Sequence, residues 1–113
     1  MKNTYAKIQK EIRSVLAKEG LVRYAENLEG YKYVEELHDM VEGSYVRWIH
    51  LDRRELTNGA FLVLVDIRED GIYLLMKKKF NQMFSVWADE CLVFQKLRSD
   101  EHVLLRAMER YLH

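Results

Sequence analysis

The sequence predicts an α+β fold, a five-stranded antiparallel meander with helices before it and one helix after it. Three observations predict this class. Apolar residues recur at helical spacing near both ends of the chain, whereas over residues 43–98 the spacing changes to two. The period-two segments are also separated by stretches too short for a helical crossover, so neighbouring strands must pair antiparallel. We therefore expect a single domain, 1–113, with a helical part over 1–42, the meander over 43–98 and a closing helix over 99–113.

The N-terminal part carries apolar residues on one helical stripe over residues 4–19. These positions are Tyr5, Ile8, Ile12, Val15 and Leu16. Asn3 or Thr4 can cap the start of this helix, and Gly20 stands where a helix commonly ends. Residues 21–28 are expected to continue as a short helix. Helical spacing over 31–41 predicts a second helix, although the letters YKYV also alternate like a strand.

Five segments of the meander are rich in β-branched and aromatic residues: 45–51, 60–67, 72–78, 83–88 and 92–97. The pairs Asn58-Gly59 and Asp70-Gly71 favour turns between them. The run FLVLVDI is apolar at nearly every position, so we expect its strand to be buried on both faces. The strand count and turn placement resemble small barrels of the SH3, Tudor or Sm type. A strongly curved sheet covered on one face by the helices is the alternative.

The closing helix is predicted over residues 99–113. Ser99 is a favourable N-cap, and Asp100 and Glu101 complement the positive end of the helix dipole. Apolar residues then recur on one stripe as far as Leu112.

Composition limits the function classes. The chain has 113 residues with 18 basic and 18 acidic side chains, so its formal net charge is zero. Nonspecific nucleic-acid binding depends on a large positive excess, which this chain lacks. There is one cysteine, no apolar N-terminal leader and no run of apolar residues long enough to span a membrane. We expect a cytoplasmic protein with no membrane span.

Residues that could carry catalysis are few. The four histidines share no metal-ligand spacing, and Cys91 follows two acids, which disfavours a reactive thiolate. Asp66 is the one acid inside an apolar run, but it lies near a turn, so we expect partial solvation or a hydrogen bond to the turn. No phosphate-binding, hydrolase or metalloprotease motif occurs. The sequence predicts no enzyme activity, no cofactor and no metal.

Binding residues are expected among the aromatic and basic side chains of the meander. The candidates are Trp48, Arg53, Arg54, Tyr73, Lys77, Lys78, Lys79 and Trp87. Aromatic rings can hold cations or stack on bases, although rings also fill small cores. Lysines at strand ends can flank a ligand, although they also protect exposed edges. We expect a non-enzymatic protein-interaction or assembly module, with a protein partner or self-association. The alternative is a nucleic-acid-binding small barrel that uses a local basic and aromatic patch.

Four stretches carry a family resemblance: GSYVRWIHL (43–51), LTNGAFLVLVDI (56–67), DECLVFQKL (89–97) and VLLRAME (103–109). Together they resemble small uncharacterised proteins of large nucleocytoplasmic DNA viruses, from about residue 28 onward. The resemblance implies an infected cell's cytoplasm or the virion as the setting, and a structural component of a viral particle or complex as the role. It supplies no site residues.

Overall fold

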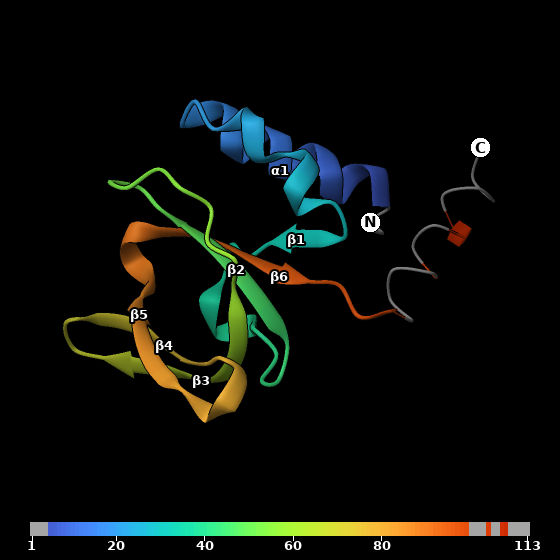
Figure 1. Cartoon of the computed structure of the whole chain (residues 1–113). Coiled ribbons are helices and arrows are strands. Elements are labelled where there is room, and N and C mark those ends of the chain that lie inside the picture. The colour runs from blue at the N-terminus through green and yellow to red at the C-terminus, as the bar shows by residue number, and fades with distance from the viewer. Residues whose placement is uncertain (1–4, 100–103, 105–106, 109–113) are drawn as a thin grey trace. The chain divides into compact units, whose positions relative to one another are not determined.

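The computed structural model describes residues 5–99, 104, 107 and 108. Within this range the protein has one α-helix and an open, six-stranded antiparallel sheet (Figure 1). The chain divides into two compact units, residues 1–33 with 96–113 and residues 34–95. The helix predicted over 99–113 lies largely outside the described residues. The α+β class is therefore confirmed, while the number of strands differs from the prediction.

The first unit contains α1 (Tyr5–Lys18), which confirms the first predicted helix. Ile12 and Leu16 on its apolar stripe are fully buried. At the end of the helix the Leu16 carbonyl accepts from Glu19 N–H at 3.1 Å and from Leu21 N–H at 2.9 Å, so this terminal acceptor is satisfied within the chain. None of the helices in the described part of the chain has the length and apolar character needed to cross a membrane.

The prediction of a second helix over residues 31–41 was wrong. Residues 31–33 form a strand, β1 (Tyr31–Tyr33), and only a 3-10 turn over Leu37–Asp39 follows it. Residues 21–28, where one short helix was expected, form two short 3-10 helices, Val22–Tyr24 and Glu26–Leu28. The alternation of the YKY letters was the correct signal, because aromatic side chains fit a pleated surface better than a helix interior. β1 raises the number of strands from the predicted five to six.

The second unit contains the predicted meander. Its strands are β2 (Tyr45–His50), β3 (Ala60–Arg68), β4 (Gly71–Lys77), β5 (Met83–Trp87) and β6 (Cys91–Lys96). Their order in the sheet is β6-β2-β3-β4-β5, and every neighbouring pair is antiparallel. The five predicted strands are confirmed to within about a residue at each end. β5 is the last strand of the order, so the sheet is open and does not close into the predicted small barrel (Figure 1).

One face of this sheet forms the core of the second unit. Its buried members are Met40, Val46, Trp48, Ala60, Leu62, Leu74, Met76, Ala88 and Val93. Gln95 is the buried polar side chain among the described residues, and its Oε1 accepts a hydrogen bond from Val41 N–H at 2.9 Å. That bond satisfies an acceptor that would otherwise cost free energy to bury.

The opposite face of the sheet is exposed along β3, so the prediction that FLVLVDI is buried on both faces was wrong. The strand alternates between the two faces, with an irregularity in its pairing between Leu62 and Leu64. Phe61 is 45% exposed, Ile67 is 66% exposed, and Leu64 is also exposed. An apolar run indicates burial only when both faces of a strand are covered, and here only one is.

Candidate interaction cleft beside the edge of β5

A cleft of about 420 Å³ lies between β5 and the loop 51–59 that joins β2 to β3. Its lining comes from β2, from that loop, from β5 and from the start of β6: Trp48, His50, Arg53, Glu55, Leu56, Thr57, Phe84, Ser85, Val86, Trp87 and Cys91. The rings of Trp48 and Phe84 lie 6.0 Å apart and belong to its apolar part. All lining residues lie within the second unit.

The β5 wall directs alternate backbone groups away from the sheet, and of these the Trp87 carbonyl meets Cys91 Sγ at 3.5 Å. Lys78 N–H donates to the Gln82 carbonyl at 2.9 Å, which makes Lys78 and Gln82 a hydrogen-bonded pair of the β4–β5 hairpin. Hydrogen-bonded and non-hydrogen-bonded pairs alternate along an antiparallel ladder. Phe84 and Val86 therefore bond to β4, whereas the residues between and beside them direct their N–H and C=O groups away from it. Those residues are Met83, Ser85 and Trp87.

The composition of β5 is unusual for an edge strand. Its five residues, MFSVW, include no charged side chain and no proline. Natural edge strands are commonly protected by charges, prolines or bulges, because an uncharged free edge is a template for another strand. Charges stand only beyond its ends, with Lys77, Lys78 and Lys79 before it and Asp89 and Glu90 after it.

The loop wall is fixed to β2 by hydrogen bonds. Thr57 N–H donates to the Trp48 carbonyl at 3.0 Å, and Trp48 N–H donates to Thr57 Oγ1 at 3.2 Å. Arg47 Nε donates to the Thr57 carbonyl at 2.9 Å. Gly59 completes the loop with φ +93°, and a Cβ there would lie 2.6 Å from the Val46 carbonyl oxygen. Only glycine fits this approach, so the loop passes close against β2.

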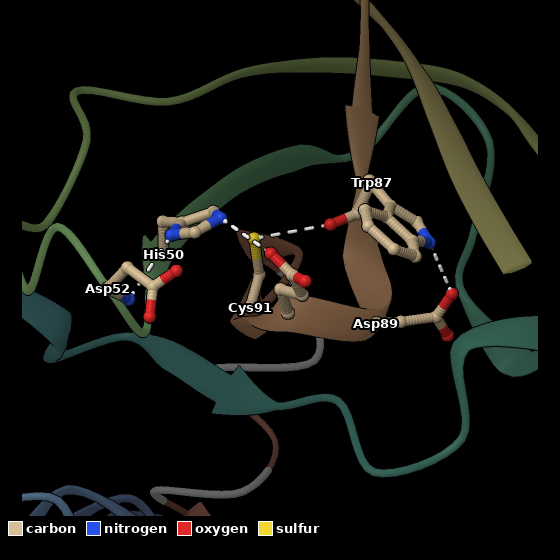
Figure 2. Close-up of polar contacts among 6 residues, drawn as sticks. His50, Asp52, Trp87, Asp89 and Cys91 are labelled. Carbon is tan, nitrogen blue, oxygen red and sulfur yellow. Dashed lines mark hydrogen bonds and ion pairs between the residues drawn. The ribbon is translucent and has the colours of Figure 1, made fainter.

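A polar group of side chains lies at one end of the cleft (Figure 2). His50 Nδ1 accepts a hydrogen bond from Asp52 N–H at 3.2 Å, and His50 Nε2 lies 3.2 Å from Glu90 Oε2. Side-chain ligand atoms of His50, Asp52 and Glu90 all lie within 4.8 Å of one another, so these residues could in principle hold a metal ion. Metal-bound histidines normally donate their second N–H to an acceptor. His50 Nδ1 instead faces a donor, which favours a proton on Nε2 directed at Glu90 over a metal.

Cys91 belongs to the same end of the cleft. The Cys91 thiol donates a weak hydrogen bond to the Trp87 carbonyl, with Sγ 3.5 Å from the oxygen. Burial, together with the charge of Glu90, raises the pKa of the thiol to about 11, against a smaller opposing effect of Arg53. The thiol is therefore protonated at neutral pH, as expected for a partly buried apolar side chain and not for a nucleophile.

The outer face of the sheet carries a second aromatic group. The rings of Tyr73 and Trp87 stack with centres 6.4 Å apart, and the Arg68 guanidinium lies 4.4 Å above the Tyr73 ring. Each member is held by a carboxylate: Asp66 accepts from Arg68 Nε at 2.8 Å, Asp70 accepts from Tyr73 Oη at 2.9 Å, and Asp89 accepts from Trp87 Nε1 at 2.6 Å. The bond to Asp70 raises the pKa of Tyr73, and the bond to Asp66 raises the pKa of Arg68.

The candidate residues from the sequence fall into separate places. Trp48, Arg53 and Trp87 line the cleft, and Tyr73 stacks on Trp87 on the outer face. The other basic candidates, Arg54, Lys77, Lys78 and Lys79, do not line it, although Lys78 Nζ lies 5.4 Å from the Phe84 ring centre.

Ser85, Thr57 and Glu90 belong to the cleft or its polar end, and no sequence pattern identified them. Ser85 matters for the direction of its backbone N–H, and Thr57 matters for the hydrogen bonds that hold the loop to β2. No sequence motif marks either feature. Glu90 is distant in sequence from His50, its partner in the structure. The one signal that could have pointed to the edge was the uncharged MFSVW segment between two charged stretches.

No family model, curated protein or solved structure matches this chain.

Proposed function

We propose that this protein is a non-enzymatic protein-interaction module that binds an extended segment of a partner by strand addition to β5. The observation that carries the proposal is the outer edge of β5, where Met83, Ser85 and Trp87 direct backbone groups away from β4. This edge is uncharged, and Ser85 and Trp87 line the cleft. In strand addition, main-chain hydrogen bonds supply affinity and pockets for alternate side chains supply specificity. The edge offers the first, and the cleft beside it offers the second.

The character of the cleft supports binding over catalysis. Its apolar part is formed by Trp48, Phe84 and Leu56, which can take an apolar side chain of the added segment. Its titratable groups are poorly placed for chemistry, since the Cys91 thiol has a raised pKa and both ring nitrogens of His50 have partners. The viral resemblance supports an assembly role in a viral particle or complex, with the cytoplasm as the compartment.

A test uses a displayed library of random peptides selected on the immobilised chain, followed by binding measurements with the selected peptides. We expect Ser85→Pro to weaken binding about tenfold, because it removes an outward N–H and places a ring at the free edge. Ser85→Ala is the matched control, since it keeps that N–H and should bind as the natural chain does. Selected peptides that bind the proline variant equally well would contradict strand addition, and so would a selection that yields no binder.

A second candidate function is nucleic-acid binding on the outer face. It is favoured by the exposed stack of Arg68, Tyr73 and Trp87, because stacked rings and guanidinium groups can hold unpaired bases. Fluorescence anisotropy of a labelled single-stranded oligonucleotide tests it. Binding should fall steeply with salt and should be lost on Trp87→Ala, with Phe80→Ala as an exposed aromatic control. Absence of binding at low salt excludes this candidate.

A further inference from the structure

The partner that fits the β5 edge best can be inferred from the strand itself, and this inference rests on the proposed function. The edge can accept a strand of many sequences, because its contacts are main-chain hydrogen bonds. Two further features narrow the choice. They are the positions of the exposed apolar side chains of β5 and the charges beyond its two ends.

We propose that the occupant of the β5 edge is a second copy of this chain, bound antiparallel by two-fold symmetry about Ser85. In this pairing Ser85 lies opposite Ser85 of the other copy, and Met83 lies opposite Trp87. The residues with outward backbone groups on one copy face residues with outward groups on the other. Each facing pair can therefore exchange hydrogen bonds as in a continuous antiparallel sheet. At the Met83–Trp87 pairs, the Met83 N–H would replace or share the weak contact of Cys91 Sγ with the Trp87 carbonyl.

The exposed side chains of β5 are complementary in this register. Met83 is 48% exposed and Trp87 is 43% exposed, and they are the large apolar side chains that β5 leaves exposed. Symmetry about Ser85 places each Met83 beside the Trp87 of the other copy. A methionine sulfur beside an aromatic ring is a favourable contact, and directly opposed side chains are the unit of sheet stabilisation. Each copy thus covers the apolar side chains of the other.

The charges beyond the strand are complementary in the same register. β5 is preceded by Lys77, Lys78 and Lys79 and followed by Asp89 and Glu90. A parallel arrangement would bring lysines beside lysines and acids beside acids. The antiparallel arrangement brings the lysine end of each copy beside the acidic end of the other, so the interface contains two such pairs of opposite charge. Opposite charges at an interface fix register and suppress the alternative with like charges facing each other. The zero net charge of the chain also adds no long-range repulsion between copies.

Disulfide cross-linking tests the register directly. Ser85→Cys is made in a Cys91→Ser background, and Met83→Cys in the same background is the matched control. Facing residues of a hydrogen-bonded pair have Cα atoms about 5.5 Å apart, which a disulfide can bridge. We expect Ser85→Cys to form a covalent dimer under mild oxidation, and Met83→Cys to do so at least about tenfold more slowly, because position 83 faces position 87. Equal rates for the two variants, or no dimer at position 85, would overturn the proposal.

Sedimentation equilibrium of the natural chain measures the association itself. We expect a concentration-dependent dimer whose dissociation constant rises about a hundredfold on Ser85→Pro, since each interface contains position 85 twice. Circular dichroism of the proline variant checks that it is folded. A chain that stays monomeric at every concentration, while selected peptides still bind in a way that Ser85→Pro abolishes, overturns the second copy as occupant and leaves the proposed function standing. A monomer that also selects no peptide overturns both.

Discussion

The two walls of the cleft satisfy their backbone groups in different ways. The loop 51–59 is irregular and charged, yet Thr57 ties it to β2 on both its N–H and its side chain. β5 is regular and uncharged, yet alternate residues direct their backbone groups away from β4. The difference shows that a residue in a regular strand does not always have its backbone N–H and C=O groups hydrogen-bonded within the chain. Changes in the loop should therefore act on folding stability, and changes at the outward positions of β5 should act on association.

The largest effect is expected from Trp48→Ala at the base of the cleft. Trp48 is 9% exposed and belongs to the core, so truncation should lower the free energy of unfolding by about 3–5 kcal/mol. Trp87→Ala on the β5 wall should cost about 1 kcal/mol, because its ring is half exposed. Urea denaturation measures both. Similar losses for the two tryptophans would mean that the β5 wall is part of the core.

Two proline substitutions test the alternation within β5. Val86 bonds to β4, so Val86→Pro should cost about 3 kcal/mol or more in unfolding free energy. Ser85 faces away from β4, and proline is tolerated on an edge strand where the N–H faces solvent, so Ser85→Pro should cost less than about 1 kcal/mol. Thermal and urea unfolding of the two variants give the comparison. A reversed order would show that the outward residues have been assigned wrongly.

Gly59 and Gly43 form a matched pair for the loop wall. Both have positive φ, but a Cβ at Gly59 would meet the Val46 carbonyl and the Tyr45 ring, whereas nothing lies near a Cβ at Gly43. Gly59→Ala should therefore lower the free energy of unfolding by about 2–3 kcal/mol, and Gly43→Ala by about 1 kcal/mol. Equal effects in chemical denaturation would mean that the loop moves away from β2 without cost.

A smaller effect is expected from the Thr57 hydroxyl. Thr57→Val keeps the shape of the side chain and leaves the Trp48 N–H without its partner, so it should cost about 1 kcal/mol. Thr57→Ser keeps the hydroxyl and should cost less. Hydrogen exchange of the Trp48 amide reports on this bond directly, and it should accelerate in the valine variant alone. An unchanged exchange rate of the Trp48 amide in Thr57→Val would mean that the Thr57 hydroxyl does not help to hold the loop against β2.

The smallest effect concerns Cys91 and pH. Because its pKa is raised from 9.0 to about 11, the folded chain holds the thiol proton more tightly than the unfolded chain does. The resulting stabilisation is present below about pH 9 and is lost as pH rises toward 11. Alkylation by iodoacetamide, followed by mass spectrometry, should show a rate that still increases between pH 9 and 11. A rate that levels off near pH 9 would mean that the thiol is solvated.

The sequence was sufficient for the strands of the second unit because each begins or ends near a turn pair and is rich in β-branched or aromatic residues. It was insufficient for residues 31–41, where Tyr31, Val34 and Leu37 fit a helical period while the chain forms a strand and a turn. It also misjudged β3, since apolar letters at Phe61 and Ile67 do not reveal that one face of the strand lacks a cover.

The candidate site was predictable in part. Trp48, Arg53 and Trp87 were identified from their residue types and do line the cleft. Ser85 could not be identified in that way, because its importance lies in the direction of its backbone N–H. That direction depends on the parity of the hairpin ladder, which one hydrogen bond at Lys78 determines.

The turn between β4 and β5 has a practical consequence. Phe80 is 99% exposed and has φ +65°, and Asn81 beside it also has positive φ. An exposed loop tip of this kind tolerates insertions and is a preferred site for proteases. Chymotrypsin should therefore nick the chain first after Phe80, leaving both fragments held together by the β4–β5 ladder. A small dye attached at the same tip would lie next to the start of β5 without covering it. Its fluorescence could follow occupation of the edge in real time.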